Sequence, residues 1–306
     1  MQASIPDGVW PTMITPFTED NTVDYGALAD LVAWYLARGV DGLFAVCQSS
    51  EMFYLSLDEK TAIARRVVKA ANGRVPVIAS GHTSQDMKVQ IQELKAMADT
   101  GIDALVLVAN RLAEGKESEE VWRRNAETIL NAIPDVLLGL YECPYPYKRL
   151  LSPQLLEWCA LTSRIVFLKD TSCDVSDIAA KAAAVRGKGL KVFNANAATL
   201  LDSLEAGASG YSGVMANFHP ELYVWLMRNW RKEPEAAREL QSFLGVASLI
   251  ERQVYPTNAK YFLNLDGLRM SPISRVNGGI ELTASQRREV EQLQEMSEIY
   301  RCRLAL

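Results

Sequence analysis

Short apolar runs alternate with amphipathic stretches from residue 9 to residue 230. Each apolar run has the length of a β-strand and is too short for a typical helix. We predict strands at residues 9–14, 42–47, 75–79, 104–109, 136–141, 165–169, 190–194 and 210–215. The amphipathic stretches predict helices at residues 24–37, 57–71, 85–100, 118–132, 153–161, 175–185, 197–206 and 220–230.

The order of these elements predicts an α/β fold. Strands without polar alternation indicate a parallel sheet that is buried on both faces. Eight strand–helix units favour a (β/α)8 TIM barrel, whereas a doubly wound sheet has about five or six strands. After Trp230 only helices are expected, over residues 235–254, 258–265 and 285–304. We therefore expect a catalytic barrel over residues 1–230 and a C-terminal helical domain over residues 231–306.

Composition and charge exclude several classes of protein. Apolar residues make up 49% of the 306 residues and charged residues 23%, which argues against a disordered chain or a coiled-coil rod. The net charge is −5 and no long run of Lys and Arg occurs, so we expect no nucleic-acid partner and no membrane surface. No apolar stretch has the length of a membrane span, and residues 1–11 lack a signal-peptide pattern.

Cysteine and histidine usage narrows the chemistry further. The five cysteines form no C-x-x-C pair, so we expect no disulfide framework and a cytoplasmic location. The two histidines, His82 and His219, form no H-x-H or H-E-x-x-H motif, and we predict no metal site. Structural roles are expected for both histidines.

The sixth and fifth apolar runs end in residues that can carry chemistry, because a barrel's active site lies at the carboxyl ends of its strands. Lys169 closes the sixth run, where both a snorkelling or ion-paired lysine and a desolvated amine are compatible with the pattern. A desolvated amine has a lowered pKa and forms a Schiff base with a ketone. Tyr141 closes the adjacent fifth strand and either moves protons at that imine or packs against the next loop.

The loop after the second run suits a carboxylate ligand. It reads Cys47-Gln48-Ser49-Ser50-Glu51 and leads into a helix. The two serine hydroxyls and the backbone amides of such a helix start can bind an anion. Ser-Ser-Glu is also an ordinary helix cap, so this loop alone does not distinguish the two interpretations.

Together these motifs resemble the dihydrodipicolinate synthase / N-acetylneuraminate lyase superfamily of class I, pyruvate-type aldolases. The resemblance covers essentially the whole chain. Residues 8–17 are similar to the family's opening strand and T-P-F turn, and residues 47–51 correspond to its G-T-T-G-E loop. Residues 141–144 correspond to the Y-N-x-P motif, and residues 169–172 correspond to K-D/E-[ST]-[ST]. The separation of 28 residues from Tyr141 to Lys169 is usual in the family.

The resemblance implies a role for each matching residue. Lys169 is expected to form a Schiff base with pyruvate or another 2-oxo acid, and Tyr141 is expected to be the proton shuttle. Ser49, with Gln48 and Ser50 beside it, is expected to hold the substrate carboxylate, and Ser212 is expected to border the site. The family needs no cofactor and is usually homotetrameric, and we expect the same here.

The chain departs from the family where the second substrate is recognised. Dihydrodipicolinate synthases carry a P-Y-Y segment whose tyrosine completes a proton relay between subunits, whereas residues 109–111 read Ala-Asn-Arg. Arg111 is instead expected to bind an acidic or hydroxylated tail. Pro146 replaces the arginine that holds the aldehyde partner's carboxylate, and Lys148 and Arg149 substitute for it only if the loop folds back.

Two further departures from the family pattern lie after the fifth and the seventh predicted strands. Glu142 replaces the family's asparagine, and residues 197 and 198 are alanine where sialic acid lyases carry acidic residues. We therefore expect a Schiff-base-forming lyase that acts on pyruvate or a related, sugar-derived 2-oxo acid by aldol cleavage, condensation or dehydration. The alternative within the family is a 4-hydroxy-tetrahydrodipicolinate synthase with a divergent relay. Two further alternatives are a phosphate-binding barrel that uses residues 207–213, which is a different class of protein, and a non-catalytic ligand-binding relative.

Overall fold

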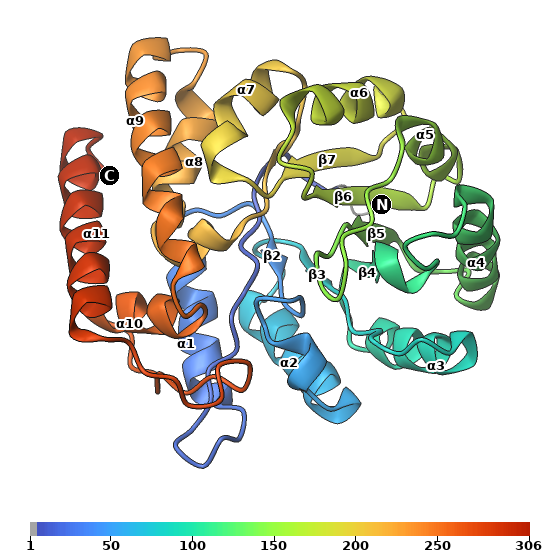
Figure 1. Ribbon diagram of the computed structural model, residues 1–306, viewed down its shortest axis with the longest axis horizontal. Coiled ribbons are helices and arrows are strands. Elements are labelled where there is room, and N and C mark those ends of the chain that lie inside the picture. The colour runs from blue at the N-terminus through green and yellow to red at the C-terminus, as the bar shows by residue number, and fades with distance from the viewer. Residues whose placement is uncertain (1–4) are drawn as a thin grey trace.

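Eight short parallel strands close into a barrel in the computed structural model, which describes residues 5–306 (Figure 1). The strands are β1 (Gly8–Val9), β2 (Leu43–Phe44), β3 (Val77–Ala79), β4 (Ala104–Val108), β5 (Leu138–Tyr141), β6 (Ile165–Asp170), β7 (Lys191–Asn194) and β8 (Gly210–Tyr211). Their order is β1-β8-β7-β6-β5-β4-β3-β2. A parallel bridge from Thr12 to Phe44 joins β1 to β2 and closes the ring. The predicted (β/α)8 barrel is thereby confirmed.

Helices surround the barrel, and side-chain caps start several of them. They are α1 (Tyr25–Ala37), α2 (Leu57–Ala71), α3 (Met87–Ala98), α4 (Glu119–Ala132), α5 (Pro153–Leu161), α6 (Val175–Val185), α7 (Leu200–Glu205) and α8 (Pro220–Asn229). Ser56 and Glu59 form a reciprocal capping box at the start of α2, which satisfies amides that the helix leaves unpaired. The predicted ranges of α2, α5 and α6 agree with the structure at both ends.

Several predicted boundaries are wrong, each for a local reason. Strand β1 ends at Val9 instead of residue 14, because Pro11 has no amide hydrogen to continue the ladder. Strand β8 ends at Tyr211 instead of residue 215, and the 3-10 helix η4 (Val214–Asn217) follows it. Helix α3 begins at Met87 instead of residue 85, because the Asp86 carboxylate caps the helix by accepting from the Lys88 and Val89 amides.

Two predicted helices are divided into a 3-10 turn and an α-helix. The range 197–206 forms η3 (Ala197–Thr199) and α7. The range 235–254 forms α9 (Pro234–Ala247) and η5 (Ser248–Arg252). The chain then continues into α10 (Thr257–Leu265) and α11 (Ala284–Arg303), close to their predicted bounds. Within residues 5–306, every helix is too short or too polar to cross a lipid bilayer.

Aromatic rings fill the inside of the barrel. Phe167 stacks on Phe193 with ring centroids 4.5 Å apart, and Trp10 lies 5.5 Å from Phe167. Gly42 is required beside Trp10, because a Cβ at that position would lie 2.3 Å from the indole ring. These rings pack the barrel interior, so the polar groups of the strands gather at its carboxyl end.

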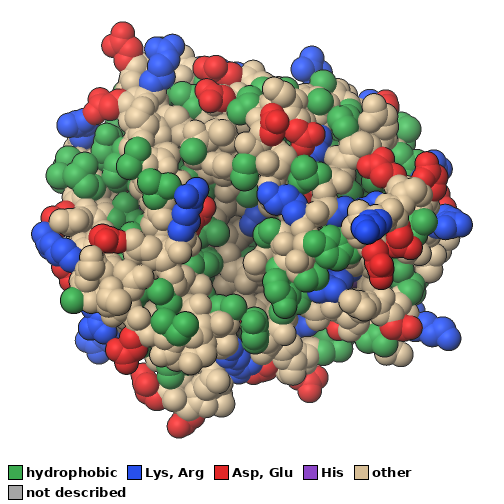
Figure 2. Space-filling model, in the orientation of Figure 1, with side chains coloured by type: hydrophobic (Ala, Val, Ile, Leu, Met, Phe, Trp, Pro, Cys, Tyr) green, Lys and Arg blue, Asp and Glu red, His purple; other side chains and the backbone are tan. Residues whose placement is uncertain are grey.

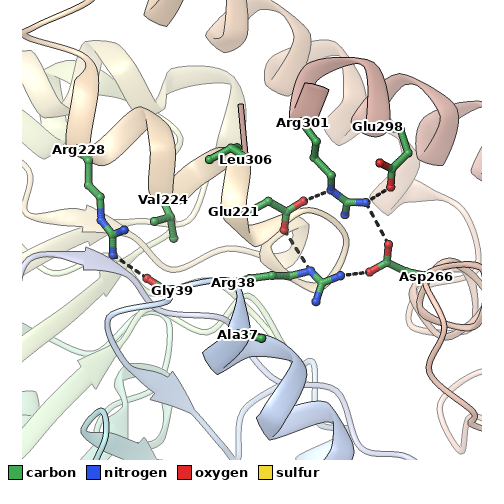
Figure 3. Close-up of a pocket in the computed structure, with 10 residues that line it drawn as sticks. All are labelled: Ala37, Arg38, Gly39, Glu221, Val224, Arg228, Asp266, Glu298, Arg301 and Leu306. Carbon is green, nitrogen blue, oxygen red and sulfur yellow. Dashed lines mark hydrogen bonds and ion pairs between the residues drawn. The ribbon is translucent and has the colours of Figure 1, made fainter. Parts of the chain in front are cut away.

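An ion-pair ring ties the C-terminal helices to the barrel (Figure 3). We define it as Arg38 after α1, Glu221 in α8, Asp266 after α10 and Arg301 in α11. Arg38 Nε lies 3.3 Å from Glu221 and Arg301 Nη1 lies 3.0 Å from Asp266, while Arg301 also pairs with Glu221 and Arg38 with Asp266. The four residues line a hollow of about 520 Å³ and form ion pairs with one another.

Candidate active site

A cavity of about 330 Å³ lies at the carboxyl ends of the strands. It brings together Gln48 and Ser49 from the loop after β2, Tyr141 at the end of β5 and Lys169 near the end of β6. Four of the seven predicted site residues therefore share one cavity. The other residues that line it are Pro144, Lys148, Thr171, Cys173, Ala195, Asn196, Val214, Glu251, Tyr255, Pro256 and Val276.

Lys169 is a buried amine at the centre of this group. Its Cα is paired in register with that of Tyr141 on β5, and its Nζ lies 4.7 Å from the centroid of the Tyr141 ring. The side chain is 4% exposed, and within residues 5–306 no carboxylate lies at ion-pair distance from Nζ. Burial lowers the pKa of Lys169, because desolvation disfavours the ammonium form. The amine is thereby favoured as a nucleophile.

Tyr141 retains its proton beside this amine. Its hydroxyl donates to Gln48 Oε1 at 3.4 Å, and its ring packs edge-on against Phe44. Burial, with a smaller contribution from Cys143, raises the pKa of Tyr141 well above its usual value of 10. The phenol is therefore a proton donor next to Lys169 and not a standing phenolate.

The loop of residues 47–51 is held by its own side chains. Ser49 Oγ donates to Thr12 Oγ1 at 3.2 Å and faces the cavity. Ser50 Oγ instead lies 2.6 Å from the Met13 carbonyl and accepts from the Cys47 amide at 3.1 Å. Gln48 and Ser49 are therefore placed to contact a ligand, whereas the Ser50 hydroxyl is engaged inside the loop.

Glu51 fastens the same loop to the C-terminal part of the chain. Its backbone is left-handed, with φ of 61°, and its Oε2 accepts from Ser274 Oγ at 3.1 Å and from the Val276 amide at 2.8 Å. Lys260 lies 3.6 Å from the other carboxylate oxygen, Oε1. The position of Ser49 thus depends on contacts that cross from the barrel to the segment that precedes α11.

Ser212 and Arg111 do not line the cavity of their own chain. Ser212 is fully buried after β8, and its amide donates to the Asn194 carbonyl at 2.9 Å. Arg111 is the last residue of the 3-10 helix η2 (Ala109–Arg111). Its guanidinium lies 5.3 Å from the centroid of the Phe53 ring.

The adjacent lysine and arginine after β5 have different partners. Lys148 lines the cavity, and its Nζ donates to the Thr171 carbonyl at 2.7 Å. Arg149 donates instead to the carbonyls of Glu114 and Glu117. The loop therefore does fold back, and it supplies a cation at Lys148 where Pro146 has no donor.

A second buried lysine lies behind the cavity wall, in a group that we call the Lys181 cluster. Lys181 Nζ lies 2.8 Å from Glu142, 2.5 Å from Asp170 and 2.7 Å from Asp177. Glu142 also accepts from the Leu151 amide at 2.9 Å. Burial and the Asp170 charge raise the pKa of Glu142 to about 7, and the carboxylates raise the pKa of Lys181. The cluster accounts for the glutamate that follows Tyr141, because Lys181 neutralises it.

Sequence reasoning missed three polar residues of the cavity, namely Asn196, Glu251 and Tyr255. Asn196 lies two residues past the end of β7 at Asn194, so reading that far into the loop would have found it. Glu251 and Tyr255 lie in and after η5, in the helical segment that follows the barrel. The pattern of apolar runs that predicts the strands does not predict that residues after the barrel approach the site.

The two histidines have structural partners, as expected. His82 Nε2 accepts from the Val108 amide, and His82 Nδ1 is 2.9 Å from the Gln90 side chain. His219 Nδ1 is 2.8 Å from Ser297 Oγ, which links the start of α8 to α11. Burial lowers the pKa of His82 to about 4 and that of His219 to about 3, so both rings are neutral at pH 7.

Comparison with known proteins gives matches over most of the chain. The sequence profile of the dihydrodipicolinate synthetase family matches residues 6–295. A 4-hydroxy-tetrahydrodipicolinate synthase from Clostridium perfringens is 27% identical over 85% of this chain and 88% of its own length. The enzyme of the same name from Sorangium cellulosum is 33% identical over 70% of each chain.

Solved structures of the family have the same fold. A prophage protein of the dihydrodipicolinic acid synthase family from E. coli K12, in complex with pyruvate, superposes with a TM-score of 0.86. It is 24% identical, and the match covers 95% of this chain and 98% of that chain. The chloride-inhibited dihydrodipicolinate synthase from Acinetobacter baumannii, complexed with pyruvate, superposes with a TM-score of 0.84 at 25% identity, over 97% of this chain and all of that chain.

Proposed function

The chain belongs to the dihydrodipicolinate synthetase family, and on that premise we propose that it is a lyase that holds a 2-oxo acid as a Schiff base on Lys169. The observation that carries the proposal is the buried Lys169 amine, 4.7 Å from the Tyr141 ring centroid and without a carboxylate partner in the described chain. A lysine used only for structure would have its amine satisfied at this depth, as carboxylates satisfy Lys181 and as the Gly81 carbonyl and the Thr83 hydroxyl satisfy Lys60.

The reaction begins with attack of the Lys169 amine on the C2 carbonyl of the 2-oxo acid. The new C–N bond replaces the carbonyl C–O bond, and the oxygen leaves as water after it has gained two protons. The Tyr141 hydroxyl passes one proton from the nitrogen to the oxygen, and the second proton comes from solvent, so the nitrogen keeps one hydrogen as the iminium. Ser49 Oγ and the Gln48 amide bind the carboxylate group of the substrate. The resulting iminium withdraws electrons from C3, which permits cleavage, condensation or elimination at that carbon.

Borohydride trapping tests this function. Protein treated with pyruvate and borohydride is expected to carry a reduced pyruvyl group on the peptide that contains Lys169. An adduct on another lysine, or no adduct at all, contradicts the mechanism. A panel of 2-oxo acids, with and without an aldehyde, then identifies the second substrate.

The favoured substrate is a sugar-derived 2-oxo acid, cleaved or dehydrated. A second candidate is the synthase reaction, in which aspartate semialdehyde condenses with pyruvate. The amine of Lys148 favours it, because this cation lines the cavity and can bind the carboxylate of the aldehyde. Saturable consumption of aspartate semialdehyde with pyruvate, without turnover of deoxy-sugar acids, supports the synthase and contradicts the favoured substrate.

The remaining predicted site residues have indirect roles in this proposal. Ser50 maintains the loop that presents Ser49. Ser212 supports the wall of the cavity after β8. Arg111 contacts the substrate tail from a neighbouring subunit, since its guanidinium lies outside the cavity of its own chain.

We also propose that the protein is a cytoplasmic homotetramer with a domain boundary at residues 230 and 231. Apolar side chains gather at the left edge of Figure 2, where α11 lies in Figure 1. Met296 and Ile299 of α11 are 41% and 49% exposed, which favours contact with another copy. Light scattering coupled to size exclusion tests the oligomeric state.

All five cysteines are free, as is usual for a reducing compartment, and this supports the cytoplasmic location.

A further inference from the structure

Glu251 is a carboxylate of the cavity that the proposed reaction does not use. It lies in η5 and lines the same cavity as Lys169 and Tyr141. Within residues 5–306, no donor hydrogen-bonds its side chain and no cation lies at ion-pair distance from it. Burial nevertheless raises its pKa, so the carboxylate is partly desolvated without a partner of its own. An acidic group in this condition is suited to a ligand that donates a hydrogen bond.

The charge of Glu251 acts directly on the reacting amine. It is the only carboxylate among the groups that perturb Lys169 in the described chain, and Lys169 is the largest charged influence on Glu251 in return. Once Lys169 carries an iminium, the same carboxylate balances its positive charge across the cavity. Glu251 is thus coupled to the bound state of the substrate and not only to the empty site.

The cavity is larger than pyruvate requires. About 10–15 Å³ of accessible volume is enough for one water, so a cavity of about 330 Å³ has room for many more atoms than the six non-hydrogen atoms of pyruvate. The additional space is lined by polar groups. Asn196 Oδ1 accepts from the Ala198 amide, which leaves the Asn196 amide nitrogen able to donate, and Lys148 supplies a cation. A longer substrate with polar groups beyond C3 therefore fits the cavity better than an apolar chain.

We propose that Glu251 is a specificity-determining residue that accepts a hydrogen bond from a hydroxyl group on the tail of a 2-oxo acid held on Lys169. The ligand class is a 2-oxo acid of about six carbons with hydroxyl groups beyond C3. A substrate ammonium group is disfavoured, because Lys148 and Lys169 already place two cations in a cavity with one carboxylate. This inference rests on the proposed function, since it requires the imine on Lys169.

The experiment compares three acids by the concentration that gives half-maximal borohydride trapping on Lys169, a readout that needs no turnover. The probes are pyruvate, 2-oxo-3-deoxygluconate and 2-oxohexanoate, of which the last two have equal chain length but differ in their hydroxyl groups. The wild-type protein is expected to trap 2-oxo-3-deoxygluconate at lower concentration than 2-oxohexanoate. Glu251→Ala is expected to weaken trapping of the hydroxylated acid by about 10- to 150-fold, the range for a hydrogen bond to a charged group.

The controls separate failure of the inference from failure of the function. Glu251→Gln keeps the shape but removes the charge, and it is expected to lie between wild type and Glu251→Ala. Glu235→Gln removes an exposed carboxylate from the first turn of α9 and is expected to match wild type. Trapping of pyruvate is expected to weaken in Glu251→Ala too, because the iminium loses its counter-charge, but by a smaller factor than trapping of the hydroxylated acid.

Each outcome has one meaning. No trapping of pyruvate by the wild-type protein overturns the proposed function. Normal trapping of pyruvate, with no preference of the wild type for the hydroxylated acid, overturns the inference alone. The inference is also overturned if Glu251→Ala weakens all three acids equally, because Glu251 then supports the structure of the site and does not recognise a hydroxyl group.

Discussion

Two lysines on opposite sides of the β5–β6 wall are both buried, and their environments differ. Lys181 is surrounded by Glu142, Asp170 and Asp177 at 2.5–2.8 Å. Lys169, on the cavity side, has aromatic and thiol neighbours and no carboxylate at ion-pair distance in the described chain. Carboxylates raise the pKa of Lys181, whereas burial lowers that of Lys169.

Alternation along the strands produces this difference. Residues 169 and 170 are consecutive on β6, so their side chains point to opposite faces, and the Asp170 carboxylate meets Lys181 and not Lys169. Glu142 likewise follows Tyr141, and its side chain points to the opposite face, where it contacts Lys181. The wall thus directs its negative charge away from the cavity, which leaves one amine desolvated without a partner and the other fully neutralised.

Removing the reacting amine has the largest expected effect. Lys169→Arg keeps a cation but offers no amine that can form an imine, so borohydride trapping of pyruvate on the chain is expected to disappear, together with turnover. Lys188→Arg, on a partly exposed lysine after α6, is the matched control and is expected to behave as wild type. Persistent trapping in Lys169→Arg would reassign the imine to another lysine.

The next largest effect is expected at the neighbouring phenol. Tyr141→Phe keeps the packing on Phe44 but removes the proton donor, and kcat is expected to fall about 10²- to 10⁴-fold with a smaller change in KM. Tyr54→Phe, at an exposed tyrosine, serves as the control. Steady-state kinetics on the best substrate of the panel measure both constants. A near-normal kcat would show that Tyr141 serves only in packing and is not the proton donor.

On the other side of the wall the expected effect is on stability. Lys181→Met leaves the carboxylates of Glu142 and Asp170 buried without a counter-charge, and breaking a buried pair in this way costs about 3–5 kcal/mol. Urea unfolding of the variant measures the loss, with Lys188→Met as the control. Because the two carboxylates remain, the double variant Lys181→Met/Glu142→Gln is expected to recover part of it. An unchanged midpoint for Lys181→Met would show that the cluster is not stabilising.

The smallest expected effect is a difference in pH dependence. Glu142 has a folded-state pKa of about 7 against 4.5 when unfolded, so the stability that its raised pKa contributes is complete below pH 4.5 and is lost as the pH rises through 7. Relative to Glu142→Gln, the wild type is therefore expected to lose up to about 3 kcal/mol between pH 4.5 and 7.5. Thermal unfolding of both proteins across this range measures the difference, and parallel curves would contradict it.

The strand-end rule predicted that Lys169 and Tyr141 lie together in a cavity, because its signal is local. Lys169 and Tyr141 each close an apolar run, and parallel pairing in register places such residues side by side. The same rule placed Gln48 and Ser49 at the cavity. It did not distinguish Ser49 from Ser50, since the direction of each hydroxyl depends on carbonyls of the segment after β1.

Other features depend on distant parts of the chain. Glu251 reaches the cavity only because the helices after the barrel fold back over it. The pattern of apolar and polar positions in residues 235–254 predicts a helix but does not predict that approach. The Lys181 cluster joins β5, β6 and α6, so the compensation of Glu142 by Lys181 is visible only once those elements are packed. Pairing between residues 39 positions apart carries no signal in a single sequence.

The two hydrogen bonds that Glu51 accepts from Ser274 and Val276 limit how parts of this chain can be exchanged in evolution or by engineering. The loop that presents Ser49 belongs to the barrel by sequence, yet the groups that anchor it belong to the helical part. A gene fragment that encoded the eight strands alone would carry every expected reacting residue and still lack the anchor of the loop that is expected to bind the substrate carboxylate. Recombination between relatives is therefore constrained to exchange residues 47–51 and 274–276 together, although more than two hundred positions separate them.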